Sequence, residues 1–495
     1  MDQIVDWHSR AASLEVEGRA CIEGRFVPAQ SGKTFSCVNP ANGKVIAEVA
    51  ACEAADVDRA VASARQAFRA GTWSRLGPLE RKRILIAFAD GILAHREELA
   101  LLETLNVGKP ISSSLNGDIP SAANCIRWYG EAIDKVYGEV APLSHDMTTM
   151  VIREPLGVVA AVVPWNYPLS MAAWKLGPAL AAGNSVVLKP AEQSPFTAIR
   201  IAQIALDAGI PPGVFNVVPG LGETAGRALG MHVDVDAVGF TGSTEVGKLF
   251  MQYAGQSNIK RVGLECGGKS PHIVLASCRD LDAAARAVAA GIFANQGQVC
   301  NAGSRLIVEE SVREALLERV VALAEALEPE DPLLSTTKLG ALVSQPQMER
   351  VLGYIDAGRA EGARVVAGGA RVRETSGGFF IAPTIFDGVN NSMRIAREEI
   401  FGPVLSTISV SGYDEAMAIA NDTPYGLAAA VWTDDLKTAH RAARDLHAGV
   451  VWINCFDRGT MSSPFGGFKQ SGFGRDKSLH AIDKYTDLKA VWFAH

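Results

Sequence analysis

Apolar strand-like runs alternate with helical segments through the middle of this chain, and this alternation constrains the fold more than any other feature. Residues 156–163 form a continuous apolar run, typical of a strand covered on both faces of a parallel sheet. A helical segment follows at 169–182, and the next strand-like run occupies 185–188. The rhythm continues to a run at 260–264. Short turns between such elements predict a doubly wound, mostly parallel α/β sheet.

The alternation continues after residue 265 and predicts a second α/β unit. Its strand-like runs occupy 272–275, 306–308, 407–410, 428–432 and 449–454. The tail at 484–493 alternates in the manner of an edge strand or a strand that pairs with a partner. Two local expectations are a helix capped by Asp56 that ends at Phe68, and a short helix over 223–229.

Composition narrows the class of protein. The 495 residues are 48% hydrophobic and 20% charged, which gives enough material for two or three domains. A net charge of −7 without a basic run argues against nucleic acid or an anionic membrane surface as a partner. The apolar runs are too short to cross a bilayer, and residues 1–8 do not read as a signal peptide. The eight cysteines are scattered, so we expect a reducing, cytoplasmic location and no metal site.

Cys300 is the first candidate for chemistry. It lies among small and amide residues in the stretch 293–304, between a predicted helix and a predicted strand. A cysteine acts as a nucleophile only as its thiolate, which backbone N–H groups or a nearby base favour. The alternative is that Cys300 is a small buried hydrophobic residue, as most cysteines are.

Two polar residues at predicted strand ends could assist such a cysteine. Glu265 ends a strand before a Gly-Gly turn, and a partly buried carboxylate there could act as a general base. Asn166 follows the run at 156–163 and could donate its amide to an oxyanion. The alternatives are a solvated glutamate and a plain turn between two prolines.

Two other turns could bind a dinucleotide. The turn at 240–247 contains Gly242 and Gly247 between a strand and a helix, whose first N–H groups could bind a phosphate. It is not the G-x-G-x-x-G fingerprint, so an ordinary turn is equally compatible. Lys189 and Glu192 follow another strand and could hold ribose hydroxyls, or they could form a solvated turn.

Taken together, these segments resemble the NAD(P)-dependent aldehyde dehydrogenase superfamily over nearly the whole chain. The matching motifs are Pro-Trp-Asn at 164–166, Lys-Pro-Ala-Glu at 189–192, Phe-Thr-Gly-Ser-Thr-Glu-Val-Gly at 240–247, Glu-Cys-Gly-Gly-Lys-Ser-Pro at 265–271, Gln-Gly-Gln-Val-Cys at 296–300, Glu-Glu-Ile-Phe-Gly-Pro at 398–403 and Pro-Phe-Gly-Gly-Phe-Lys-Gln-Ser-Gly at 464–472. Seven motifs in order are far more specific than any one of them.

The resemblance implies a role for each matching residue. Cys300 would add to the aldehyde and form a thiohemiacetal. The Asn166 side chain and the backbone N–H of Cys300 would hold the oxyanion. Hydride transfer to the nicotinamide would leave a thioester, which water activated by Glu265 would hydrolyse. Lys189 would serve both catalysis and the cofactor. The implied cofactor contacts are Trp165, Lys189, Glu192, Gly242, Ser243, Val246, Gly247, Gln347, Glu399 and Phe401.

The resemblance also implies an architecture. A doubly wound, Rossmann-like cofactor domain would comprise residues 1–132 and 155–264, and an α/β catalytic domain would comprise 265–462. A small β bridging unit, 133–154 with 480–495, would make a homodimer or homotetramer.

Three stretches are similar to one subgroup, the bacterial γ-glutamyl-γ-aminobutyraldehyde dehydrogenases of putrescine and polyamine catabolism, which also oxidise other ω-amino aldehydes. They lie at 108–120, 126–138 and 454–480. An acidic pair, Asp118 and Asp457, would suit a cationic substrate, whereas Arg458 would suit a glutamyl carboxylate. The candidate channel residues are Tyr167, Trp174, Asp118, Asp457 and Phe465.

Several alternatives stay open at this point. The substrate could instead be betaine aldehyde or a general aliphatic aldehyde. Glu192 facing the adenosine ribose favours NAD, although Lys189 leaves NADP possible. A cofactor-independent thioesterase or esterase using Cys300 and Glu265 is a different class of function, and a non-catalytic member of the fold is a third.

Overall fold

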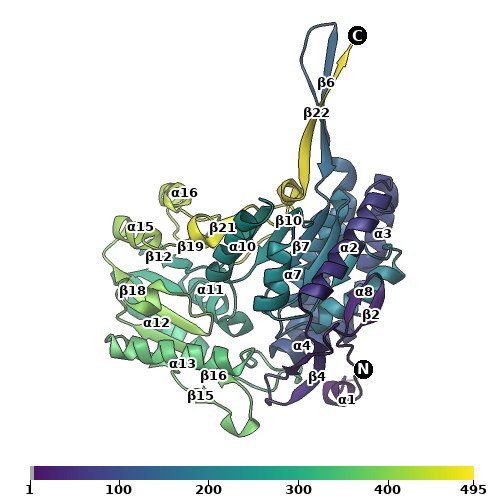
Figure 1. Cartoon of the computed structure of the whole chain (residues 1–495). Coiled ribbons are helices and arrows are strands. Elements are labelled where there is room, and N and C mark those ends of the chain that lie inside the picture. The colour runs from purple at the N-terminus through teal and green to yellow at the C-terminus, as the bar shows by residue number, and fades with distance from the viewer. Residues whose placement is uncertain (1–4) are drawn as a thin grey trace.

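The computed structural model describes residues 5–495 and contains two large sheets, each flanked by helices, with a narrow arm that projects from the molecule (Figure 1). The cofactor domain was predicted to begin at residue 1, and residues 1–4 lie outside the described part. The predicted α/β class is confirmed, because both sheets are built mainly from parallel strands that alternate with helices.

The first sheet has eight strands. In spatial order they are β2 (Arg25–Val27), β1 (Ala20–Ile22), β9 (Phe215–Val217), β8 (Ser185–Lys189), β7 (Val158–Val162), β10 (Ala237–Thr241), β11 (Arg261–Glu265) and β21 (Gly472–Phe473). Every residue of β7, β8 and β10 is buried, as expected for strands covered on both faces. Helices pack on the two faces, among them α2 (Ala54–Ala70), α3 (Pro78–Ala94), α4 (Arg96–Val107), α6 (Ile119–Ala132), α7 (Pro168–Ala182), α8 (Phe196–Asp207) and α10 (Thr244–Gln256).

The order of the first sheet reverses at β7. The chain runs outward from β7 through β8 to β9, and then returns to place β10 and β11 on the other side of β7. Such a reversal leaves a crevice at the carboxyl ends of β7 and β10, which is where doubly wound sheets bind ligands. The fold therefore identifies one edge of this sheet as the place to look for a site.

The second sheet has seven strands. In spatial order they are β14 (Arg364–Ala367), β17 (Thr384–Asp387), β18 (Val404–Val410), β13 (Arg305–Glu309), β12 (Pro271–Val274), β19 (Ala428–Trp432) and β20 (Val450–Ile453). Its helices include α11 (Leu281–Phe293), α12 (Glu310–Glu325), α13 (Gln345–Ala360), α15 (Tyr413–Asn421) and α16 (Leu436–Asp445). The chain enters this sheet directly after β11, so the two sheets meet near Glu265.

The arm is a three-stranded antiparallel sheet. Its strands are β5 (Glu139–Ala141), β6 (Met147–Pro155) and β22 (Thr486–Ala494), with β6 in the centre. β22 pairs with β6 over nine residues, from Thr486 opposite Pro155 to Ala494 opposite Met147. Figure 1 shows this arm extending away from both sheets, and β22 forms one of its edges.

Two local expectations differ from the structure. Helix α2 begins three residues earlier than expected, because Glu53 is its N-cap and Asp56 completes a capping box from inside the first turn. The segment expected as one helix over 223–229 starts as a wide turn at Gly222–Gly226 and becomes α9 only at Arg227–Met231. Two glycines in that turn weaken an ordinary helical start.

Candidate active site

The predicted cofactor residues of the first sheet gather where its strand order reverses. Lys189 is the last residue of β8, Trp165 follows β7, and Gly242 follows β10. Since these three strands are neighbours and parallel, their carboxyl ends lie along one edge. The edge is the crevice in which a dinucleotide would be expected.

Lys189 and Glu192 lie together at this edge. Lys189 Nζ donates to the Pro190 carbonyl at 3.0 Å and lies 3.4 Å from a Glu192 carboxylate oxygen. Burial lowers the pKa of Lys189, and the charge of Glu192 opposes that effect. Lys189 is 3% exposed, whereas Glu192 is only partly buried. A buried ammonium beside a carboxylate that reaches solvent matches the donor and acceptor needs of a ribose.

The turn at 240–247 leads into α10 as predicted. Ser243 is the N-cap, and its hydroxyl accepts a hydrogen bond from the Val246 N–H at 3.3 Å. Ser243 and Val246 are both exposed at the start of the helix. Packing explains why a glycine stands at position 247, because a Cβ there would come 2.8 Å from Cys266 Sγ. The helix start is therefore close to the segment that carries Glu265.

Glu265 ends β11 as predicted and is 3% exposed. Neither of its carboxylate oxygens has a hydrogen-bond partner among residues 5–495. Burial, and then the charge of Asp476, raise the pKa of Glu265 to about 8, against the opposing charges of Lys484, Lys175 and Arg475. A buried carboxyl group that titrates near neutrality has the properties of a general base.

Cys300 lies in a tight loop after α11. The loop turns through Asn295 and Gln296, whose φ angles of 48° and 58° are in the left-handed region. Cys300 itself is partly exposed. Burial of the thiol and three carboxylates (Glu399, Asp457 and Glu265) raise the pKa of Cys300 to about 12. The resting group is therefore a thiol, and its activation needs a change in its surroundings.

Asn166 is held against the same loop. Its amide Nδ2 donates to the Gln298 carbonyl at 2.9 Å, and Asn295 Nδ2 donates to the Asn166 carbonyl at 3.0 Å. An amide NH₂ group carries two hydrogens, so one remains for another acceptor. Asn166 therefore contacts Gln298, which precedes Cys300 by two residues, and an oxyanion donor is needed close to Cys300.

The part of the chain that builds the second sheet contributes Glu399, Phe401 and Gln347, and two of these contact residues from near the first sheet. Glu399 accepts a hydrogen bond from the Gly268 N–H at 3.0 Å, three residues after Glu265. Burial raises the pKa of Glu399 to about 7. Gln347 Nε2 donates to the Phe401 carbonyl at 2.8 Å, and the Phe401 ring contacts the Trp165 ring edge-on at 5.2 Å. The two sheets thus share one crevice.

The predicted channel residues are brought together, but the two acids differ. The Trp174 and Phe465 rings contact edge-on at 5.2 Å. Lys109 Nζ lies 4.1 Å from the centre of the Tyr167 ring and 2.6 Å from Asp118. Asp118 is buried in this ion pair. Lys109 Nζ is also 3.6 Å from the buried Glu103, so one ammonium group faces two carboxylates. Asp118 is thus held in a buried charged cluster and is not exposed to a substrate cation.

Asp457 is exposed and accepts a hydrogen bond from Asn301 Nδ2 at 2.9 Å. Asn301 directly follows Cys300. Arg458, the residue considered for a glutamyl carboxylate, is exposed on the same loop. The structure therefore joins Asp457 to the cysteine loop, a contact that the sequence did not indicate.

A charged cluster beside Glu265 was not predicted. Lys175 of α7 and Lys484 both hydrogen-bond Asp476, and all three side chains are buried or nearly so. Although burial opposes it, the two ammonium groups hold the pKa of Asp476 below its usual range. The sequence carried one signal: Lys175 is the sole charged residue of the apolar helix Pro168–Ala182.

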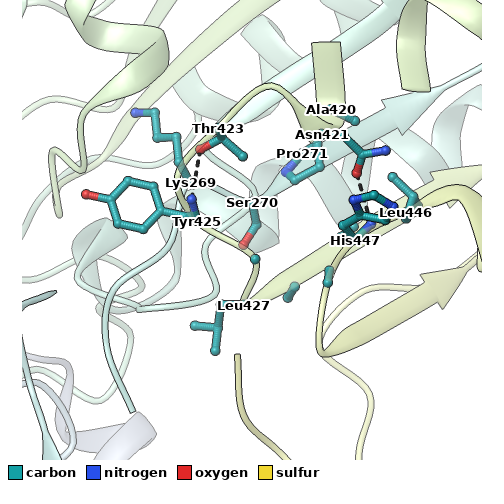
Figure 2. Close-up of a pocket in the computed structure, with 14 residues that line it drawn as sticks. Lys269, Ser270, Pro271, Ala420, Asn421, Thr423, Tyr425, Leu427, Leu446 and His447 are labelled. Atoms are coloured by element: carbon teal, nitrogen blue, oxygen red, sulfur yellow. Dashed lines mark hydrogen bonds between the residues drawn. The ribbon is translucent and has the colours of Figure 1, made fainter. Parts of the chain in front are cut away.

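A separate hollow has Lys269 among its lining residues and is shown in Figure 2. It is lined by Lys269, Ser270, Asn421, Tyr425 and His447, among others, and holds about 10 Å³. That is about the least room that a water molecule needs, so an aldehyde or a dinucleotide does not fit. Within residues 5–495 there is no cluster of three metal-ligating side chains and no helix with the length and hydropathy to cross a membrane.

Comparisons with known proteins agree with this geometry. The aldehyde dehydrogenase family model matches residues 26–491. The aminoacetaldehyde dehydrogenase of Pseudomonas aeruginosa is 52% identical over 483 residues, which is 97% of each chain. An indole-3-acetaldehyde dehydrogenase solved with NAD⁺ has a TM-score of 0.98 and 59% identity, with 99% of each chain covered. A γ-glutamyl-γ-aminobutyraldehyde dehydrogenase from Burkholderia cenocepacia has a TM-score of 0.97 and 58% identity, again over 99% of each chain. The chain therefore belongs to the aldehyde dehydrogenase family.

Proposed function

We propose that this enzyme oxidises ω-amino aldehydes, γ-glutamyl-γ-aminobutyraldehyde among them, to carboxylic acids with NAD as the acceptor. The observation that supports the chemistry is the convergence of Cys300, Asn166 and Glu265 where the two sheets meet. Two similar proteins bear names that specify an amino aldehyde or its γ-glutamyl derivative. The substrate class places the enzyme in putrescine or polyamine breakdown.

The residues of the chain divide the reaction between them. The Cys300 thiolate adds to the aldehyde carbon, and the free Asn166 amide hydrogen with the Cys300 backbone N–H holds the oxyanion of the thiohemiacetal. A nicotinamide cofactor, when bound, would supply the hydride acceptor, and Cys300 would then keep the acyl group as a thioester. Glu265, once ionised, accepts a proton from the water that hydrolyses this thioester.

The acceptor site is proposed from the edge where the strand order reverses. Lys189 and Glu192 would hold the adenosine ribose, the start of α10 at Ser243 would face the pyrophosphate, and Glu399 with Phe401 would position the nicotinamide end. The Glu192 carboxylate disfavours a 2′-phosphate, which favours NAD, while Lys189 at 3.4 Å from it leaves NADP usable. The region of the first sheet would be the cofactor domain, and the region of the second would be the catalytic domain.

The arm is proposed as the surface that makes a homodimer or homotetramer. β22 is an edge strand, and it exposes Leu488, Trp492 and Phe493. An exposed strand edge with apolar side chains favours pairing with another chain. The eight cysteines are all unpaired, which fits a reducing cytoplasm.

The first experiment is NADH formation with a substrate panel, each member tested with NAD and with NADP. The panel contains γ-glutamyl-γ-aminobutyraldehyde, 4-aminobutyraldehyde, 4-guanidinobutyraldehyde, betaine aldehyde, indole-3-acetaldehyde and propanal. A kcat/KM advantage of roughly tenfold, or about 1.4 kcal/mol, for the amino or γ-glutamyl aldehydes supports the proposal. A preference for indole-3-acetaldehyde, betaine aldehyde or propanal would overturn the substrate class and leave the chemistry intact.

A further inference from the structure

The surroundings of Cys300 disfavour the thiolate, which is the form that a nucleophilic cysteine must adopt. After burial itself, the groups that most disfavour the Cys300 thiolate are three carboxylates, Glu399, Asp457 and Glu265. Like charges close together disfavour ionisation of a thiol, as they do for a pair of acids. A nucleophile placed among acids becomes reactive when positive charge arrives beside it.

Of these three carboxylates, Asp457 is the exposed one, and it is hydrogen-bonded to the residue after Cys300. Asn301 Nδ2 donates to it at 2.9 Å, and Asn301 is 4% exposed and adjacent in sequence to Cys300. Among residues 5–495, no lysine, arginine or histidine lies within 4.0 Å of Asp457. Desolvation of the carboxyl group raises the pKa of Asp457, and the Asn301 hydrogen bond and the charge of Lys477 only partly oppose that effect. The Lys477 ammonium lies over the Trp174 ring, 5.1 Å from its centre.

The loop that carries Asp457 is held in a strained shape. Asp457 and Asn454 have φ angles of 51° and 52°. Phe456 stacks on the buried His272 ring at 4.9 Å, and both Asn454 amide contacts are to the Thr433 backbone. Left-handed backbone at a non-glycine residue is retained where the surrounding structure enforces it, often at functional sites. The loop thus holds an exposed acid against the cysteine loop.

We propose that Asp457, oriented by Asn301, binds the cationic end of the substrate and that the bound positive charge promotes ionisation of Cys300. The proposal rests on the amino-aldehyde function proposed above. When the ammonium group pairs with Asp457, the negative field on Cys300 weakens, and the thiol proton passes to water. The thiolate then adds to the aldehyde of the same substrate molecule. An uncharged aldehyde of equal length gains neither the ion pair nor the activation.

The other charges around Asp457 support this division of roles. Asp118 and Glu103 share the buried Lys109 ammonium, and Asp118 is 8% exposed, so a substrate cation does not reach it. Glu265 is buried beside Lys175 and Lys484, and Glu399 accepts its hydrogen bond from Gly268. Burial, and then the charges of Asp118 and Asp457, raise the pKa of Tyr167 well above the usual range, so its hydroxyl stays neutral. Asp457 is therefore the acid that a cation can reach and neutralise.

The test compares two aldehydes of matched shape, 3-aminopropanal and butanal, on wild type and Asp457→Asn. Asparagine keeps the size of the side chain and tolerates positive φ, so the fold is preserved. For 3-aminopropanal we expect kcat/KM to fall by about tenfold or more, because a close charge pair is lost. For butanal we expect it to rise, because Cys300 has one negative neighbour fewer. Changes in opposite directions are the signature of the proposal.

Asp356→Asn is the matched control, since its side chain is 76% exposed on α13, pairs with Arg359, and has no contact with the site. It should change neither aldehyde. Parallel losses for both aldehydes in Asp457→Asn would overturn the proposal, because they would indicate a structural role. Equal kcat/KM values for the two aldehydes in wild type would instead overturn the proposed substrate class.

A second readout needs no turnover. Ultraviolet thiolate absorbance, taken as the difference between wild type and Cys300→Ala, measures the ionisation of Cys300 as pH rises. Tetramethylammonium, whose charge does not depend on pH, should move this titration to lower pH in wild type but not in Asp457→Asn, and tert-butanol, an uncharged molecule of similar shape, should move neither. A tetramethylammonium shift that persists in Asp457→Asn would overturn the role of Asp457.

Discussion

The two sheets contribute to the site in different ways. The first sheet presents Lys189 and Glu265 as the last residues of β8 and β11, so the regular backbone of parallel strands sets their positions. Loops that connect elements of the second sheet carry Cys300, Phe401 and Asp457. Those loops pass through left-handed, non-glycine residues such as Asn295, and Phe401 and Asp457 have left-handed φ themselves. The strand-end residues follow from sheet topology, whereas the loop residues depend on left-handed backbone that tertiary packing holds in place.

The largest test of this contrast is removal of Cys300, the proposed nucleophile, from its loop. Cys300→Ala should lower kcat by about 10³-fold or more, because no other group can form the thioester. NADH formation with the best aldehyde measures it. Cys278→Ala, a buried cysteine ahead of α11, is the control and should retain activity. Full activity of Cys300→Ala would remove the reacting role from the second region.

Glu265→Gln tests the strand-end base. Loss of the general base should lower steady-state turnover by about 10²–10⁴-fold while the first hydride transfer continues. We expect a rapid burst of one NADH per active site, followed by a slow phase, and a thioester on Cys300 visible by mass spectrometry. A slow phase without a burst would instead place Glu265 before hydride transfer.

Asn166→Ala tests the residue that follows β7 of the first sheet and contacts the loop that carries Cys300. Loss of an oxyanion donor should lower kcat by about 10²–10³-fold. The affinity for NAD, measured by quenching of protein fluorescence, should change little, because Asn166 contacts the cysteine loop through Gln298. A parallel loss of NAD affinity would show that the mutation disturbs the whole crevice.

The pH dependence of turnover follows from Glu265. Because its pKa is raised to about 8, the carboxylate is mostly protonated at lower pH and cannot act as a base. Where thioester hydrolysis limits turnover, kcat should therefore fall as pH drops below about 8. Lys484→Met removes a charge that lowers this pKa, so the falling limb should move to higher pH. An unchanged profile in Lys484→Met would argue that Glu265 does not control the limb.

The smallest expected effect concerns strain outside the site. Ile259 has φ of 58°, is 85% exposed, and lies between α10 and β11. Ile259→Gly should stabilise the fold by about 1 kcal/mol, because a β-branched residue is disfavoured in the left-handed region. Thermal unfolding measures this gain, and activity should be unchanged. If Ile259→Gly lowered activity, left-handed residues would serve the site in the first region as well.

Much of the fold could be predicted because its signal is local. The apolar runs at 156–163 and 185–188 became β7 and β8, and Glu265 ends β11 as expected. The positions of Lys189 and Gly242 then follow from strand pairing. Helix starts were less predictable, because the capping box of α2 depends on how Glu53 and Asp56 exchange hydrogen bonds.

The charge partners could not be predicted, because they join residues far apart in the chain. Asp476 contacts Lys175 across 301 residues, and Asn301 contacts Asp457 across 156. The sequence shows that Asp118 and Asp457 are both acidic, but only packing decides that Asp118 is buried against Lys109 while Asp457 is exposed. The sequence also gave no sign of the left-handed turn before Cys300, since such strain is imposed by neighbours rather than by local preference.

The closing strand of the first sheet has a consequence for synthesis of the enzyme. β21 (Gly472–Phe473) pairs with β11, and Asp476 and Lys484 complete the surroundings of Glu265. These residues are made last, after the entire second sheet. A nascent chain emerging from the ribosome therefore lacks two of the charges around Glu265, Asp476 and Lys484, however well its early strands have folded. The surroundings that the proposed base needs are thus completed only at the end of translation.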